Sequence, residues 1–274
     1  MSLSRIKSIV IAALVLVNAF FLTIILIDHY ADARDERQTI EKACSILQSN
    51  GIAIDPDNIK TSGTISTMRT ARIIEVEAAI AHAFLGQVDM ADQGGDIYLY
   101  ENPNRGIAEF SSAGDFSIEL LPGVIGNTDN TLKTTRELLR SMMLEVSAPE
   151  NSLDPAGEKI SVFSVYKGVK IFNCPIDFVY VGNSLKTVKG RYVADVELID
   201  DGAQISQIGT VLLGFLAAVK RDEIECKEIL SIEAGYQHSV AGVLGEGVLN
   251  PSWLITTEDG RYLIDSATGE MRNA

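Results

Sequence analysis

The sequence predicts an α+β protein: an N-terminal transmembrane helix followed by two α+β units, each an antiparallel sheet with helices on one face. Three observations support this fold class. A long apolar run opens the chain, short β-rich runs separated by turn residues follow it, and strands followed by a helix occur twice in that order. No residues align between the two halves, so the repeat is one of element order alone.

The apolar run from Ile9 to Ile27 predicts a single membrane anchor, which we assign to residues 6–27. As a helix, this run rises roughly 28 Å, close to the roughly 30 Å thickness of the hydrocarbon core. Arg5 and Lys7 carry positive charge on its N-terminal side, which predicts a cytoplasmic N-terminus and an extracytoplasmic remainder. A cleaved signal peptide normally has a shorter apolar segment of roughly 7 to 15 residues. We therefore expect a retained single-pass anchor in the cell membrane.

Asn18 is the candidate partner contact within the anchor, because it lies near the middle of the apolar run. An amide in the bilayer prefers a hydrogen-bonding partner on another helix, and such contacts contribute about 0.6 to 2 kcal/mol. Leu14, Ala19 and Leu22 would surround it and complete the contact surface. The alternative is a bond from Asn18 to the backbone of its own helix, and the sequence leaves both interpretations open.

The segment after the anchor, residues 28–51, predicts a juxtamembrane stalk helix. Ile40, Ala43 and Leu47 recur at helical spacing, and Asn50-Gly51 is a typical helix end. The first α+β unit is then predicted over residues 52–148. Its expected elements, in order, are a helix at 73–85, a polar loop at 89–96, strands at 97–100, 106–110 and 116–121, and a helix at 128–146.

A linker is expected at residues 148–157, and the second α+β unit over residues 158–274. Its expected strands are at 160–166, 169–172, 178–181 and 191–198, followed by a helix at 206–219, a segment at 228–236, and a closing hairpin of 253–256 with 262–265. Asp259-Gly260 between the hairpin strands predicts a type I′ turn, since both central residues of that turn need positive φ.

Charge and cysteine content narrow the classes of function. The formal net charge is −14, with 37 acidic against 23 basic residues, so nucleic acid is an unfavourable partner. Cys44, Cys174 and Cys226 are far apart and form no C-x-x-C pattern, which argues against a redox motif or a zinc site. A bridge between the last two is conceivable outside the cytoplasm, but three free thiols are the preferred interpretation.

The sequence carries none of the common catalytic or ligand-binding motifs. The three histidines have no metal-ligand spacing, and G-x-S-x-G and the phosphate-binding glycine patterns do not occur. Asp89, Asp92, Asp96 and Glu101 lack the spacing of a calcium loop. We therefore predict no catalytic residue, no cofactor and no metal ligand.

Several short motifs carry a resemblance to a known family. They are Arg5-Ile6-Lys7-Ser8-Ile9 before the anchor, Asn50-Gly51-Ile52 after the stalk, and, near the end, Asn250-Pro251-Ser252-Trp253-Leu254-Ile255 with Asp259-Gly260-Arg261-Tyr262-Leu263-Ile264-Asp265-Ser266-Ala267-Thr268-Gly269-Glu270. With the single anchor, the chain resembles the YycH/YycI regulatory proteins. Its P-x-W, D-G-x-Y and D-x-x-T-G-E elements also look like those of PepSY-like extracytoplasmic domains.

The resemblance implies a YycI-like or PepSY-like α+β fold and a regulatory function without enzymatic activity. Proteins of that family are membrane-anchored accessory proteins of Gram-positive bacteria that tune the YycG (WalK) sensor histidine kinase. The implied partners are such a kinase and a second YycH/YycI-like protein, while self-association stays open. Two alternatives remain: an anchored PepSY-like module that binds or inhibits an extracytoplasmic peptidase or cell-wall component, and an unrecognised surface enzyme.

Overall fold

A computed structural model describes residue 18 and residues 37–61, 65–111, 114–126, 130–155, 157–199, 205, 208–221, 223–240 and 246–274. The chain divides into two compact units. The first unit combines Met1–Pro56 with Gln207–Glu228, and the second combines Asp57–Ser206 with Ile229–Ala274. Segments far apart in the sequence therefore belong to the same unit.

The first unit contains a helix at residues 37–49, strand β1 (Ala53–Ile54) and helix α4 (Ile208–Lys220). This helix lies within the segment 28–51, whose function as a juxtamembrane stalk stays a prediction. The helix ends as expected at Asn50-Gly51, where Gly51 has a φ of 85° and the Ile52 amide donates to the Leu47 carbonyl at 3.1 Å. Both helices have apolar buried faces: Ala43, Cys44 and Leu47 on one, and Ile208, Val211, Leu212, Phe215, Leu216 and Ala218 on the other.

The second unit contains an antiparallel sheet, here called the large sheet, with strand order β8-β9-β10-β11-β7-β6-β5-β4. In chain order its strands are β4 (Asp89–Gly94), β5 (Ile97–Asn102), β6 (Gly106–Phe110), β7 (Asp115–Leu120), β8 (Glu150–Asp154), β9 (Gly157–Tyr166), β10 (Val169–Val181) and β11 (Ser184–Arg191). Alternating burial along β6 and β7 shows that one face of this sheet is covered.

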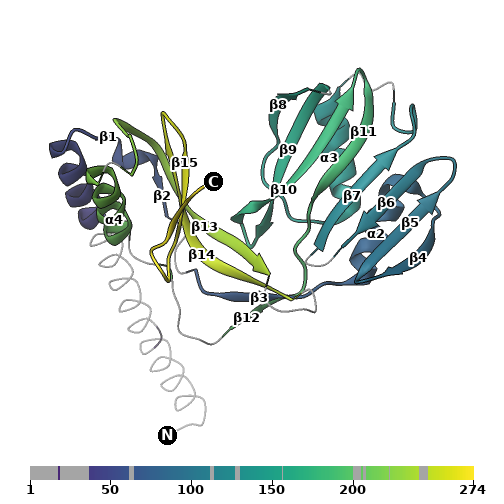
Figure 1. The fold of residues 1–274 in the computed structure, drawn as a ribbon, viewed down its shortest axis with the longest axis horizontal. Coiled ribbons are helices and arrows are strands. Elements are labelled where there is room, and N and C mark those ends of the chain that lie inside the picture. The colour runs from purple at the N-terminus through teal and green to yellow at the C-terminus, as the bar shows by residue number, and fades with distance from the viewer. Residues whose placement is uncertain are drawn as a thin grey trace, which may run out of the picture. The chain divides into compact units, whose positions relative to one another are not determined.

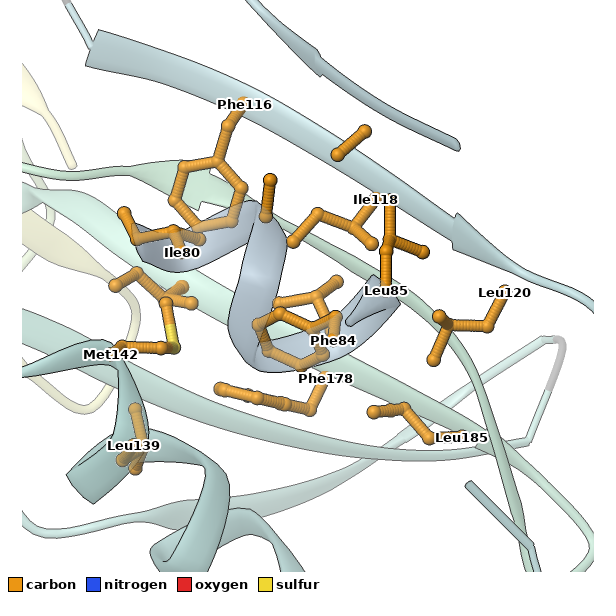
Figure 2. Close-up of a cluster of buried hydrophobic side chains, with 14 of the residues drawn as sticks. Ile80, Phe84, Leu85, Phe116, Ile118, Leu120, Leu139, Met142, Phe178 and Leu185 are labelled. Atoms are coloured by element: carbon orange, nitrogen blue, oxygen red, sulfur yellow. The ribbon is translucent and has the colours of Figure 1, made fainter. Parts of the chain in front are cut away.

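Helices α2 (Ile74–Leu85) and α3 (Thr131–Met142) pack on that face (Figure 1). The Asn130 side chain caps α3 by accepting from the Lys133 amide at 2.9 Å. Figure 2 shows the core between helices and sheet, where Phe84 of α2 lies 6.4 Å from Phe178 of β10 between ring centroids. Leu139 from α3 belongs to the same buried cluster. One continuous core therefore joins both helices to the sheet.

The C-terminal sheet has the order β16-β15-β14-β13, with β3 and then β12 continuing from one end of β14. Its strands are β3 (Met68–Thr70), β12 (Val196–Leu198), β13 (Glu228–Val240), β14 (Gly247–Thr257), β15 (Arg261–Asp265) and β16 (Met271–Asn273). The short 3₁₀ helix η1 (Pro56–Asn58) leads into β2 (Ile59–Lys60), which pairs in parallel with β13.

Strand β10 belongs to both sheets. Its register with β9 shifts between Lys170 and Pro175, and Ile171 pairs in parallel with Tyr236 of β13. One step further along, the Asn173 side chain accepts from the His238 amide at 2.8 Å and donates to the His238 carbonyl at 2.7 Å. An amide side chain thus takes the place of backbone in this ladder, and it joins the two sheets at the register shift of β10.

The α+β class is confirmed. The strand pairing, however, crosses the boundary expected between two successive units. Strand β7, from the first predicted unit, hydrogen-bonds to β11, from the second, with Val188 opposite Ile118. The two runs expected as separate strands at 169–172 and 178–181 are one strand, β10. Pairing between distant segments, which local patterns do not encode, decides both points.

Two segments expected to be irregular are edge strands. The predicted polar loop at 89–96 contains β4, and the predicted linker at 148–157 contains β8. Strand β4 is exposed at every residue, so it has no apolar alternation from which a strand would be predicted. Such polar edge strands also limit edge-to-edge association of sheets.

The closing hairpin is confirmed, but its turn is not type I′. Neither Asp259 nor Gly260 has a positive φ. Instead, the Thr257 hydroxyl accepts from the backbone amides of both residues, at 3.3 and 3.1 Å, and donates to the Gly260 carbonyl at 3.1 Å. The threonine side chain therefore organises a three-residue loop between β14 and β15 that needs no left-handed residue.

Candidate functional site

The predicted membrane contact falls almost entirely outside the described residues. Leu14, Ala19 and Leu22 are not described, and Asn18 is helical and exposed. The predicted anchor at residues 6–27 therefore stays a prediction. In the described part of the chain, no helix combines the length and the apolar character needed to cross a bilayer.

An open groove of about 570 Å³ on the second unit is the candidate site, here called the α2–α3 groove. Its volume lies within the range of ligand-binding clefts, roughly 300 to 1,000 Å³. Four separated segments line it: Glu75, Val76 and Ala79 of α2; Met142, Met143, Leu144 and Glu145 at the end of α3; Ser164, Val165, Tyr166 and Lys167 at the end of β9; and Val193 and Ala194 after β11. Most of these side chains are apolar.

Met143 is the most exposed large apolar side chain of the described residues, with 87% of its surface accessible. It occupies the C-cap of α3 in a left-handed conformation, with a φ of 56° and a ψ of 27°. Glycine is the usual residue in this conformation, because a Cβ atom makes it unfavourable. The helix end therefore turns Met143 away from the core, whereas the helical pattern predicts it on the apolar face beside Met142, which is buried.

Charged groups at the rim of the α2–α3 groove are mainly acidic. Glu75 lies in the first turn of α2, where the helix dipole favours a negative charge. Glu145 accepts a hydrogen bond from the Lys167 amide at 3.1 Å, which holds its carboxylate in place. The Lys167 ammonium lies 5.2 Å from the centroid of the Tyr166 ring. Neither carboxylate forms an ion pair with another side chain of the described segments.

The strand edge beside the groove is already paired. The Ser147 amide donates to the Phe163 carbonyl at 2.8 Å, and the Val165 amide donates to the Glu145 carbonyl at 2.9 Å. The Ser164 hydroxyl, also in the lining, donates to the Arg191 carbonyl at 3.0 Å. The groove at this edge therefore offers side chains rather than unpaired backbone groups.

A buried ionic cluster lies at the start of α2. Arg72 binds both carboxylate oxygens of Glu77, whose side chain is fully buried, and its guanidinium stacks 4.9 Å above the Tyr98 ring. The Tyr192 hydroxyl donates to Glu77 at 2.8 Å. Burial, and then the negative charge of Glu77, raise the pKa of Tyr192, so this phenol stays protonated. The pair is thus held by a bidentate contact and a neutral donor.

A second, partly buried cluster lies where the two sheets meet. Arg191 donates to both carboxylate oxygens of Asp115, at 2.7 Å each, and its Nη1 lies 3.3 Å from His238 Nδ1. His238 Nε2 lies 3.2 Å from the Thr70 hydroxyl. Because guanidinium only donates, Nδ1 accepts and Nε2 carries the proton. Burial, and then the charge of Arg191, lower the pKa of His238 to about 4, although Asp115 opposes the shift.

The space between these two clusters is too small for a substrate. A cavity of about 10 Å³ there is lined by Thr70, Ala71, Arg72, Gly114, Tyr192, Val193, Ala194 and His238. A single water needs roughly 10 to 15 Å³. The two clusters therefore connect strands to the start of α2. No group of three or more potential metal ligands is found in the described ranges.

Sequence reasoning missed the α2–α3 groove and the buried clusters. The groove residues come from four segments that are each unremarkable alone. One signal was available for Met143: the continuous run Met142-Met143-Leu144 is wider than the apolar face of a helix on a sheet, so one of its members must face solvent. His238 and Arg191 carry no comparable pattern.

The fold and the groove define an α+β protein with an open, mainly apolar groove on its second unit. Among solved structures, the chain is similar to YycH from Bacillus subtilis, with a TM-score of 0.38 and 11% sequence identity over 76% of this chain and 50% of that chain. This chain thus spans about half the length of that one. No protein-family model and no curated protein matches the sequence.

Proposed function

We propose that this chain is a membrane-anchored, non-enzymatic regulatory protein that modulates a two-component sensor histidine kinase through transmembrane and extracytoplasmic contacts. The observation that carries the proposal is the α2–α3 groove, where Met143 is held 87% exposed at the edge of an apolar surface. An exposed apolar surface of this kind is typical of a protein-binding site. The predicted anchor and the family resemblance name the kinase as the partner.

A non-enzymatic function is supported by the surroundings of the ionisable groups. Tyr192 and His238, together with Arg72, line a cavity of about 10 Å³ and do not line the groove. An active site would instead place such groups in a pocket large enough for a substrate. The groove itself is mainly apolar, and its rim carboxylates are exposed.

Regulation of this kind depends on differential binding. An accessory protein shifts a signalling equilibrium only when it binds one conformational state of the receptor more tightly than the other. Anchoring both proteins in one bilayer raises their effective concentration, so two weak contacts combine into substantial occupancy. The groove and the Asn18 face would be those two contacts.

Photo-crosslinking of the full chain in native membranes tests the proposal. Probes are placed at position 143 and, in the anchor, at positions 15, 18, 19 and 22, and captured proteins are identified by mass spectrometry. Met90 is the matched control, because it is an apolar side chain with 56% exposure on β4, away from the groove. We expect the probe at position 143 and the probes on one face of the anchor to capture a sensor kinase. Capture by the anchor probes should be lost in Asn18→Leu.

Other outcomes contradict the proposal. Capture of a peptidase or a cell-wall component from position 143, with no kinase, would favour the PepSY-like binding module. If the anchor probes form only lipid adducts, the proposed contact at Asn18 is wrong. If positions 143 and 90 capture proteins equally, the proposed contact at the groove is wrong.

A further inference from the structure

We propose that the α2–α3 groove binds an amphipathic helix that presents apolar side chains to the groove and a basic residue to Glu75 and Glu145. This inference rests on the proposed function and specifies the segment of the partner that is recognised. Three observations determine the occupant: the paired strand edge, the composition of the lining, and the charge of the rim.

The paired strand edge argues against an extended peptide that would add to β9. Strand addition requires unpaired amide and carbonyl groups along an edge. Beside the groove, the amides of Ser147 and Val165 and the carbonyls of Phe163 and Glu145 are already bonded to one another, and Val146 forms a bridge with Ser164. An occupant must therefore be recognised through its side chains, as a helix in a groove is.

The lining favours apolar side chains on the occupant and does not require one particular apolar residue. Val76, Leu144, Val165 and Val193 provide an apolar surface, and Met143 extends it from the edge. Methionine is unbranched and polarisable, so it adapts its shape to different apolar partners. A helix with apolar residues three and four positions apart places a continuous stripe against such a surface.

The rim specifies the charge of the occupant. Glu75 and Glu145 both line the groove, and no cation of the described chain pairs with either. Lys167, the one cation among the described lining residues, lies with its ammonium near the Tyr166 ring. A lysine or arginine on the incoming helix would therefore meet uncompensated carboxylates, whereas an acidic residue would be repelled. The formal net charge of −14 also favours a basic over an acidic occupant.

The test uses the full chain in nanodiscs of neutral lipid, with a photo-crosslinker at position 143. The first probe is a biotinylated peptide of about 18 residues with leucines at helical spacing and lysines beside them, long enough to form a helix on contact. A second peptide of the same composition alternates apolar and polar residues, as a strand would. A third keeps the helical spacing but replaces each lysine with glutamate.

We expect the basic helical peptide to crosslink about tenfold more than either of the other two, as 1.4 kcal/mol of preference would produce. In Glu75→Gln and in Glu145→Gln, crosslinking falls about two- to fivefold each, the range for exposed ion pairs. Ala79→Trp fills the groove from an exposed position of α2 and abolishes crosslinking. Unfolding midpoints that match the parent show that the variants are folded.

Equal crosslinking of the three peptides, preference for the alternating or acidic peptide, or equal yields from position 90 would overturn the inference. Failure here is distinct from failure of the proposed function. If position 143 captures the kinase in native membranes but the peptides show no preference, the kinase contact stands and the helical occupant is wrong. If the basic helix is preferred but no kinase is captured, the groove specificity stands and the assigned partner is wrong.

Discussion

Met143 shows how one residue can oppose folding stability and still support binding. A left-handed conformation costs a non-glycine residue roughly 1 to 2 kcal/mol. Because the Met143 side chain is 87% exposed, its burial contributes almost no stabilising free energy. Glycine would suit the C-cap of α3 better. The presence of methionine there is consistent with a side chain that contacts a partner.

Met143→Gly should therefore raise the free energy of unfolding by about 0.5 to 1 kcal/mol, because it relieves the left-handed strain. The same variant should weaken capture of the partner from a probe that replaces Tyr166 in the groove lining. Urea denaturation measures the first effect and crosslinking yield the second. Met143→Ala is the control, since it removes the side chain but keeps the strain; a destabilised glycine variant would contradict the interpretation.

His238 gives stability a defined pH dependence. Its pKa is about 4 in the folded chain against an ordinary value of about 6.5, so the unfolded state binds the proton more tightly. The contribution is therefore fully present above pH 6.5 and is lost as pH falls toward 4. Protonation would also place a donor on Nδ1, against the guanidinium of Arg191.

We expect the His238 proton to remove about 2 to 3 kcal/mol from the free energy of unfolding between pH 7.5 and pH 4.5. Urea denaturation at both pH values measures the loss. His238→Asn lacks this group, so its loss should be smaller than the parent's by that amount. Parallel pH profiles for parent and variant would show that His238 is not a buried neutral imidazole.

At the scale of elements, the start of α2 depends on the Arg72–Glu77 pair. The carboxylate is fully buried and also accepts from Tyr192, which comes from the segment after β11. The pair therefore ties α2 to a distant part of the chain. A buried charge is costly once its partner is removed, much more than an exposed one.

Arg72→Met should lower the free energy of unfolding by about 3 to 5 kcal/mol, because Glu77 is left charged and buried without its partner. In the double variant Arg72→Met with Glu77→Gln, the loss should be smaller than the sum of the two single losses by about 1 to 3 kcal/mol. Urea denaturation of all four proteins gives this coupling energy. Additive losses would mean that the two side chains act independently.

Asn173 joins the two sheets of the second unit in a comparable way. Its two hydrogen bonds to the backbone of His238 lie just beyond the Ile171 and Tyr236 pair of β10 and β13. The loss of two partly exposed hydrogen bonds is modest, about 1 kcal/mol each. Local opening, rather than global unfolding, is therefore the appropriate measurement.

Asn173→Ala should increase hydrogen exchange at the His238 amide and along the end of β13, because the amide loses its acceptor. Exchange in the core strands β6 and β7 should stay unchanged, which makes them the internal control. Faster exchange spread equally over both sheets would show instead that Asn173 contributes to global stability.

At the scale of the whole molecule, the fold is held by packing and hydrogen bonds rather than covalent bridges. Cys44 and Cys174 are buried as thiols. Burial, and then the charge of Asp55, raise the pKa of Cys44, and burial raises the pKa of Cys174 to about 12. Both thiols are therefore protonated and poorly reactive at neutral pH.

Three thiols per chain should react with a thiol reagent in denaturant, whether or not a reductant was present beforehand. In the native protein, Cys44 and Cys174 should react far more slowly than in denaturant, because they are buried and protonated. The midpoint of thermal unfolding should not change when a reductant is added. A reductant-dependent midpoint would indicate a disulfide between two of the three cysteines.

Elements with strong local sequence patterns were predicted well, and elements with weak patterns were not. Helix α2 and strands β5, β6 and β7 were predicted close to their observed bounds, because apolar periodicity and turn residues are local properties. The edge strands β4 and β8 were missed because polar, exposed strands have no periodicity. The α2–α3 groove was missed because its lining residues are brought together only by packing.

The amino-acid sequence alone determined the α+β class, most helix and strand positions and the acidic character, since each depends on composition or on neighbouring residues. The anchor stays a prediction from the same kind of local pattern. Only the tertiary structure decided that β7 pairs with β11, that β10 serves two sheets, and that Met143 is held in solvent while His238 is buried beside Arg191. These features depend on hydrogen bonds and desolvation between residues far apart in the chain, and no local pattern records them.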